Sequence, residues 1–251
     1  MEFLLFNLFG LMGSHGSIAV GEQRLSWSRP SKSAVFGLIG AACGKSRSDS
    51  VFHHGLHKDL CFAVKTVNRG QFELDFHSTQ TLPSLRKRSP APQTRKEELA
   101  HDPTKLHTIL SQREWNTDAF FTVALWFRNQ SDLSLQKILK ALKFPHFTLY
   151  LGRKSAPLGL PLNPTIISAS CLIDAYDKHQ FNDVESEVVE QLQATSQSEQ
   201  DNINEIAFDI NPPITPEQYR IEYRRDSVLN RENWFFNERE EGIYLVPDAT
   251  T

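Results

Sequence analysis

The chain has 251 residues, of which 39% are hydrophobic, so it can bury the core of one large domain or of one domain with a smaller appendage. Its formal net charge of -3 hides an uneven distribution: residues 1–155 carry 21 Lys and Arg against 12 Asp and Glu, and residues 156–251 carry 6 against 18. A basic part suits a polyanion, whereas an acidic part suits solubility, a basic protein partner or repulsion of misplaced nucleic acid.

The cysteines and the hydropathy exclude several classes of protein. Cys43, Cys61 and Cys171 lack CxxC spacing, which indicates neither a disulfide framework nor a zinc ribbon and fits a reducing cytoplasm. No segment approaches the about 18 consecutive apolar residues that a membrane span needs.

The first elements are a strand and a helix. Residues 2–9 are almost wholly apolar, which predicts a strand buried on both faces, and a glycine-rich loop follows. Apolar residues at helical spacing over 35–42 predict a helix that is capped by Ser31 or Ser33 and closed by Gly44.

The next segments are predicted strands, a polar insertion between them and a second helix. "LCFAVKTV" and "QFELDFH" flank residues 68–70, which predicts a hairpin, and residues 78–112 turn polar and proline-rich. Strands are predicted at 118–127 and 147–151 and a helix at 134–142, whereas later strands are predicted only at 218–223 and 242–247. This order predicts an α+β fold with a ferredoxin-like or RRM-type core and an inserted arm.

The string "GAACGKS" nearly matches a phosphate-binding loop. However, Ile39 occupies a required glycine position, and Gly44 and Lys45 follow the predicted helix instead of opening it. Nucleotide binding is therefore not predicted here.

The start of the same helix gives a different signal. Arg29 and Lys32 lie where the helix dipole is positive, which disfavours cations unless an anion is bound, and Ser31 and Ser33 add hydroxyl donors. Phosphate binding at this end is the prediction, and two solvated surface charges are the alternative.

Histidines and basic residues supply weaker candidates. His53, His54 and His57 are interpreted as a surface cluster without a metal. His77, Tyr150 and Lys154 could compose a metal-free RNA-cleaving site. The basic clusters around Pro90 fit either a flexible arm on RNA or a solvated loop; they comprise Arg86, Lys87, Arg88, Arg95 and Lys96.

Several stretches together resemble a known family. They are "RPSKSAVFGLIGAACG", "CFAVKTVNRGQFELDFHST", "TILSQREWNTDAFFTVALWF", "LYLGRKSAPLGLPL" and, more weakly, "NRENWFF". Over residues 1–164 the chain resembles the CRISPR-associated Cas5 family, in its CasD branch from type I-E Cascade complexes. The family commonly has a Pro-x-Gln-Ser/Ala-Trp-Gly turn where this chain has residues 11–16.

The resemblance implies an RRM-type core over residues 1–155 with a thumb at 78–112, and a small C-terminal β domain over 156–251 with an acidic insert at about 185–206. It implies a non-catalytic cytoplasmic subunit, without cofactor or metal and with no membrane contact, that caps the 5′ handle of the CRISPR RNA. Such a subunit touches the backbone and large subunits of Cascade and, indirectly, target DNA.

Residues in three places are the candidate contacts. The predicted RNA-binding residues are Gly13, Ser14, His15, Gly16, Arg29, Ser31, Lys32 and Ser33, with Arg153, Lys154 and Ser155 as a second group. The predicted thumb contacts to RNA and the backbone subunit are Arg86, Lys87, Arg88, Arg95 and Lys96. The alternatives are a metal-independent endoribonuclease that processes repeat RNA, as in type I-C relatives, and an RNA-binding module outside CRISPR systems.

Overall fold

The computed structural model describes residues 1–82, 92–129, 131, 133–195 and 204–247. Within them, nine strands join one sheet. The strands are β1 (Glu2–Gly13), β2 (Gln23–Arg24), β3 (Leu60–Asn68), β4 (Gln71–Thr81), β5 (His107–Phe127), β6 (Thr165–Ser168), β7 (Glu205–Phe208), β8 (Arg220–Asn230) and β9 (Phe235–Leu245). The helices are α1 (Lys32–Ala42), α2 (Ser50–Asp59), α3 (Arg95–Leu99), η1 (Pro103–Lys105), α4 (Leu135–Lys143), α5 (Leu172–Lys178) and α6 (Asp183–Thr195).

The predicted ferredoxin-like core is present. The four core strands lie in the order β6-β1-β5-β3, and each is antiparallel to its neighbours. Along the chain, α1 and α2 come between β1 and β3, and α4 comes between β5 and β6. Together these give the β-α-β-β-α-β arrangement of a ferredoxin-like fold. The strand predicted at 147–151 is wrong, because this segment makes only one isolated bridge, from Tyr150 to Pro157. Its alternating Leu149 and Leu151 are instead buried in the core that β1 shares with α1 and α4, and β6 takes the edge position.

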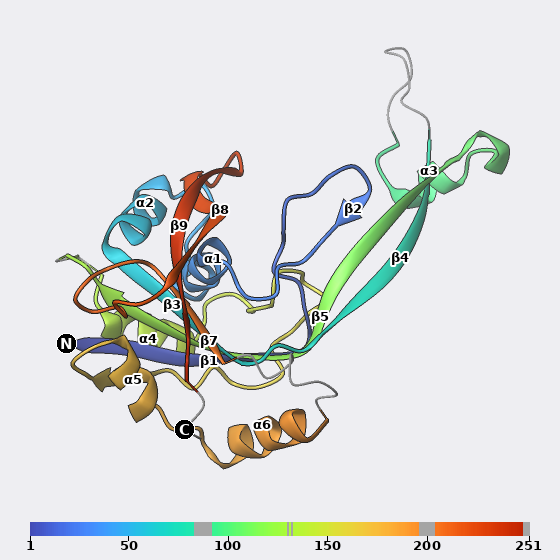
Figure 1. Cartoon of the computed structure of the whole chain (residues 1–251). Helices are drawn as coiled ribbons and strands as arrows, with labels where there is room; N and C mark the ends of the chain where they lie inside the picture. Colours follow the sequence, from blue (N-terminus) through green and yellow to red (C-terminus); the bar gives the residue numbers. More distant parts are fainter. Residues whose placement is uncertain (83–91, 130, 132, 196–203, 248–251) are drawn as a thin grey trace.

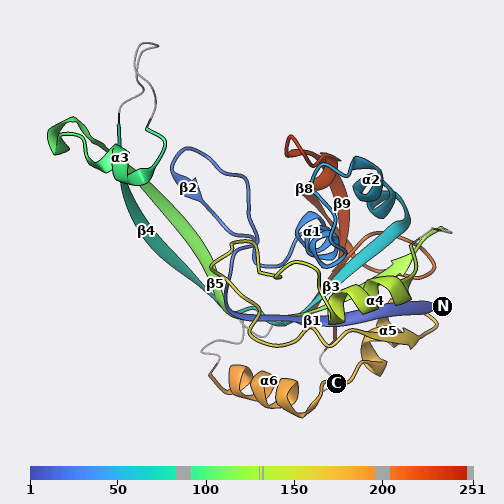
Figure 2. The same cartoon turned by 180° about the vertical axis from the view of Figure 1, so that it is seen from behind.

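Helices cover both faces of the sheet (Figures 1 and 2). Leu4, Phe6 and Leu8 of β1 pack with α1 and α4, whereas Phe3 and Leu5 face the opposite side and pack with α5. The period-2 alternation therefore serves two cores, which is why the sequence of β1 is apolar at nearly every position.

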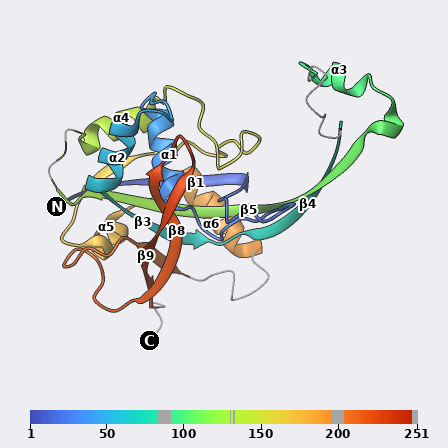
Figure 3. The same ribbon diagram turned by 90° about the horizontal axis from the view of Figure 1, so that it is seen from above.

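The predicted hairpin at residues 68–70 is wrong. β3 and β4 both pair with β5, so the chain continues in the same direction along β5 after a kink. Gly70 allows this kink: its φ is +69° and an added Cβ would lie 2.1 Å from the carbonyl oxygen of Thr117. Beyond the kink, β4 and β5 extend from the core as a two-stranded arm (Figure 3), which starts near residue 71 and carries the insertion expected at 78–112.

The C-terminal strands continue the core sheet. β7 pairs with β3, β9 pairs with β7, and β8 pairs with β9. The strands of residues 156–251 thus extend both edges of one sheet and form no sheet of their own, which differs from the predicted separate β domain. Of the predicted acidic insert, residues 196–203 lie outside the described residues.

Of the predicted surface histidine cluster, only His54 is exposed. Residues 50–59 form α2, and His53 is buried with its ring against α1, where a Cβ on Gly40 would lie 3.0 Å from His53 Cε1. Burial lowers the pKa of His53 and lowers that of His57 to about 3, so both rings are neutral near pH 7.

Candidate nucleic-acid interface

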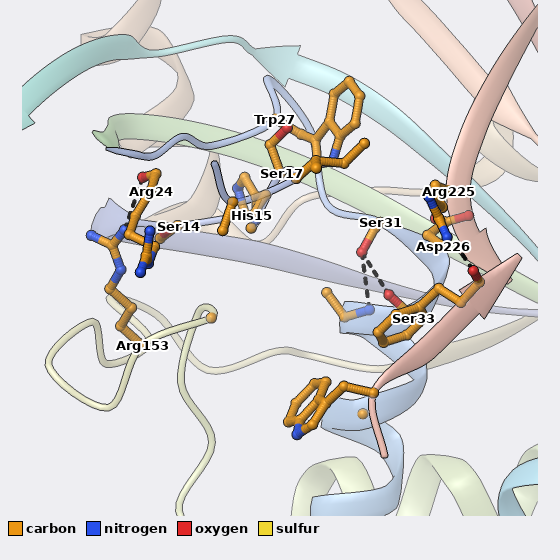
Figure 4. A pocket seen from close by; sticks show the side chains of 18 of the residues that line it. Ser14, His15, Ser17, Arg24, Trp27, Ser31, Ser33, Arg153, Arg225 and Asp226 are labelled. Carbon is orange, nitrogen blue, oxygen red and sulfur yellow. Dashed lines mark hydrogen bonds between the residues drawn. The ribbon is translucent and has the colours of Figure 1, made fainter. Parts of the chain in front are cut away.

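A cavity of about 1130 Å³ opens at the start of α1 (Figure 4). Five elements enclose it: the loop that follows β1 and carries β2, one face of α1, part of β5, the loop after α4, and the β8–β9 hairpin. Its polar, charged and aromatic lining includes Ser14, His15, Ser17, Arg24, Trp27, Ser31, Ser33, Ser111, Arg113, Tyr150, Arg153, Arg225, Asp226, Arg231, Trp234, Phe235 and Phe236.

The wall of the cavity is basic. Among the described residues that line it, arginine occurs at five positions and a carboxylate only at Asp226. That carboxylate is neutralised inside the protein, since Arg239 donates to it through Nε at 2.6 Å and Nη2 at 3.2 Å. The cavity can therefore attract a polyanion.

Arg29 and Lys32 do not need an external anion. Arg29 pairs with Glu205, Glu222 and Glu241 at 2.7–3.2 Å, and Lys32 Nζ pairs with Asp209. Both side chains are buried, and neither lines the cavity. The premise of the sequence argument, two unpaired cations at a helix start, is wrong, because the acidic C-terminal part supplies their counter-charges.

The anion expected at the helix start is itself a side chain. The backbone N–H of Lys32 donates to Asp226 Oδ2 at 2.7 Å, and Ser31 caps the helix by accepting from the N–H of Ala34 at 3.1 Å. A carboxylate thus takes the place that a bound phosphate would occupy.

The loop after β1 places its backbone beside the cavity. Ser14, His15 and Gly16 line it, as do Ser31 and Ser33, whereas Gly13 does not. His15 is buried edge-on against Phe121, and burial, then Arg224, lowers its pKa to about 3. His15 can therefore offer a ring or a neutral nitrogen near pH 7, but no charge.

Only one residue of the second predicted RNA-binding group lies at the cavity. Arg153 lines the cavity, stacks its guanidinium 4.3 Å from the ring centroid of Trp115 and donates to the carbonyl of Arg24. Lys154 and Ser155 are exposed and do not line it. Gly152 allows this loop to come close to the loop after β1, because a Cβ at Gly152 would lie 1.7 Å from the carbonyl oxygen of Ser14.

The arm candidates are only partly described. Arg86, Lys87 and Arg88 lie outside the described residues, while Arg95 and Lys96 are exposed on α3 near the end of the arm. Arg95 pairs with Glu98 at 2.6 Å, which leaves its charge partly neutralised.

The residues of the alternative sites do not line a common pocket. His77 contacts Asp75 on the arm, and neither His77 nor Lys154 lines the cavity that Tyr150 lines. Lys45 follows α1 and pairs with Asp49 at 3.2 Å. Within the described ranges, no group of three His, Cys, Asp or Glu is placed to hold a metal ion, and no helix is long and apolar enough to cross a bilayer.

Sequence reasoning missed most of the cavity arginines. Arg24, Arg113, Arg225 and Arg231 line it and were not candidates. One signal was available: "NRENWFF" was quoted for its resemblance but given no role, and it contains Arg231 and Trp234. β5 carries Arg113 to the cavity, the C-terminal hairpin carries Arg225, and the pairing of β2 with β5 places Arg24, none of which a local pattern reveals.

The ferredoxin-like core, the two-stranded arm and the basic cavity define a class of protein, the ferredoxin-like α+β folds with a protruding arm. Within this class the assignment is specific, because the family described as "CRISPR-associated protein (Cas_Cas5)" matches residues 3–225. The chain belongs to the CRISPR-associated Cas5 family.

Relatives agree with this assignment. The chain is 32% identical over 162 residues, 64% of its length, to the "CRISPR system Cascade subunit CasD" of Escherichia coli strain K12, and the match covers 69% of that protein. A chain of a "CRISPR RNA-guided surveillance complex" has the same fold, with a TM-score of 0.62, 24% identity, and coverage of 98% of this chain and 89% of that one. A second solved "Cas protein" gives a TM-score of 0.52 at 22% identity, with coverage of 96% and 94%.

Proposed function

We propose that the chain is the non-catalytic RNA-binding subunit of a type I-E Cascade complex, and that its cavity holds the 5′ handle of the CRISPR RNA. The observation that carries the proposal is the cavity wall, where Arg24, Arg113, Arg153, Arg225 and Arg231 outnumber the one neutralised carboxylate, Asp226. The CasD relative, named as a Cascade subunit, supports the assignment to such a complex.

The lining suits single-stranded RNA. Unpaired RNA is recognised by cations along its backbone and by aromatic rings and hydrogen bonds at its bases. The arginines of the wall supply cations for the phosphates. The rings of Trp27 and Trp234 and the hydroxyls of Ser31 and Ser33 supply contacts for the bases. The arm that β4 and β5 form would reach the neighbouring backbone subunit, and the large subunit would lie beside the chain.

Equilibrium binding of the 5′ handle encoded by the host's own CRISPR repeat tests the proposal. The double substitution Arg113→Gln and Arg153→Gln should weaken binding roughly 10-fold and reduce the slope of log K against log salt by about 1.4, since each single-strand phosphate contact contributes about 0.7. The matched control removes two exposed charges from α4, outside the cavity, with Lys140→Gln and Lys143→Gln. Equal losses in both variants would contradict the site.

Absence of catalysis is tested separately. Precursor repeat RNA should stay intact when incubated with the purified subunit in chelator. Cleavage within the repeat that His77→Ala abolishes would favour the endoribonuclease alternative instead.

A further inference from the structure

The turn between β8 and β9 carries an exposed tryptophan on the cavity wall. Trp234 is 56% exposed, whereas Trp115 and Trp126 are buried and Trp27 is half-buried beneath the guanidinium of Arg224. All four tryptophans lie within the described residues, and Trp234 alone among them is mostly exposed to solvent, with Phe236 beside its ring at a centroid distance of 6.2 Å.

The backbone of Trp234 is unusual for so large a residue. Its φ is +56°, in the left-handed region that bulky side chains rarely adopt. Glycine or asparagine would form this turn with less strain, and the strain is not offset by burial of the indole. A strained and exposed aromatic residue at a cavity edge points to a role in binding.

Two cations flank the indole. The guanidinium carbons of Arg47 and Arg231 lie 5.4 Å and 5.7 Å from the ring centroid of Trp234. Arg231 is held in place, because its Nη1 donates to the carbonyl of Ser33 at 3.1 Å and its Nη2 occupies the space that a side chain on Gly37 would fill, 2.0 Å from the Cβ position. The ring is thus fixed to the start of α1 through its neighbour.

We infer that Trp234, flanked by Arg47 and Arg231, is a stacking platform for one unpaired RNA base at the mouth of the cavity. The inference rests on the proposed function and extends it to a residue that neither the family match nor the relatives assign. An apolar protein segment fits less well, because cations beside an aromatic face suit a base joined to phosphates. Phe235, 60% exposed next in the chain, widens the same surface.

The test combines protein and RNA changes. Trp234→Leu keeps an apolar side chain but removes the ring, and Trp234→Phe keeps a smaller ring. We expect Trp234→Leu to weaken handle binding by about 5- to 150-fold, the range of one base–aromatic stack, and Trp234→Phe to weaken it less. Phe144→Ala is the matched control, because Phe144 is 78% exposed at the end of α4 and does not line the cavity.

Abasic RNA identifies the partner base. Among handle RNAs that each lack one base, one RNA should bind wild type as weakly as intact RNA binds Trp234→Leu, and the two changes together should cost no more than either alone. Urea unfolding midpoints must match wild type for each variant.

Three outcomes are decisive against the inference. Unchanged binding by Trp234→Leu overturns it, as does additivity at every abasic position. An effect of Trp234→Leu confined to assembly with the large subunit also overturns it, because the tryptophan is then a protein contact. Wild-type protein that fails to bind handle RNA overturns the proposed function as well, which separates the two failures.

Discussion

Arg29 donates a hydrogen bond of 2.9 Å to Glu241, whose side chain is fully buried. Truncating one partner of a buried ion pair leaves the other charge uncompensated. Arg29→Ala should therefore lower the free energy of unfolding by about 3–5 kcal/mol in urea titrations. Arg95→Ala, which breaks the exposed pair with Glu98, should change it by less than about 1 kcal/mol. Equal effects would contradict the buried network.

The same network predicts loss of stability in acid. Despite burial, which raises it, the pKa of Glu241 falls from 4.5 to about 2 because Arg239, Arg224 and Arg29 surround the carboxylate. A carboxylate with a lowered pKa stabilises the folded state fully above pH 4.5, and this stabilisation is lost as the pH falls towards 2. For Glu241 the stabilisation amounts to about 3 kcal/mol. His15, with its pKa lowered to about 3, adds a decline of the same sign that begins below pH 6.5.

Urea midpoints between pH 2.5 and 7 isolate the contribution of the glutamate. Glu241→Gln should be much less stable than wild type at pH 7, and the difference should shrink as the pH falls. A difference that stays constant over this range would show that the charge of Glu241 is not what stabilises the fold.

Adjacent basic residues after α4 should behave differently. Arg153 stacks on Trp115 and lines the cavity, whereas Lys154 is exposed outside it. Arg153→Ala should weaken handle binding by about 1 kcal/mol, and Lys154→Ala by less than about 0.5 kcal/mol. Fluorescence anisotropy with labelled handle RNA measures both, and a larger effect at Lys154 would place the RNA outside the cavity.

Gly152 couples this loop to the one after β1. Its φ is +80° and its Cβ position lies 1.7 Å from the carbonyl oxygen of Ser14, so any side chain must displace one loop. Gly152→Ala should lower stability by about 1–3 kcal/mol and weaken RNA binding together. Gly55→Ala, on α2 with open space around its Cβ position, is the control and should leave both unchanged or raise stability slightly. Thermal unfolding and anisotropy on the same samples check this.

The arm should be separable from the fold. The β4–β5 pairing runs from Gln71 opposite Thr117 to Thr81 opposite His107, so replacing residues 82–106 by a two-residue Asn-Gly turn keeps the register. We expect an unchanged unfolding midpoint but loss of co-purification with the Cascade backbone subunits. Normal occupancy of the shortened variant in Cascade would remove the thumb assignment.

Local sequence patterns predicted single strands and helices better than they predicted which strands pair with each other. The run at residues 2–9 and the apolar spacing over 35–42 correspond to β1 and α1, because burial of those faces is encoded residue by residue. The turn at residues 68–70 was misassigned as a hairpin, since a glycine with positive φ can serve a kink as well as a reversal. Only the pairing of both β3 and β4 with β5 distinguishes a kink from a hairpin here.

The candidate site was limited by long-range pairing. Arg29 was a candidate because a cation at the start of a helix is unfavourable without an anion, yet its partners Glu222 and Glu241 lie about two hundred residues away in the sequence. Ser31 was a candidate from its place at the helix start and Arg153 from the family resemblance, and both line the cavity. The counter-charges, and the arginines that face the cavity, depend on how the C-terminal strands join the sheet.

The central claim, that the cavity holds the RNA, is tested most directly by photocrosslinking. Handle RNA carrying 4-thiouridine at each position in turn would be irradiated with the purified subunit, and the crosslinked peptides identified by mass spectrometry. The account predicts crosslinks within residues 14–27, 148–153 and 225–237, which line the cavity. Crosslinks confined to α5 and α6, on the opposite face of the sheet, would contradict it.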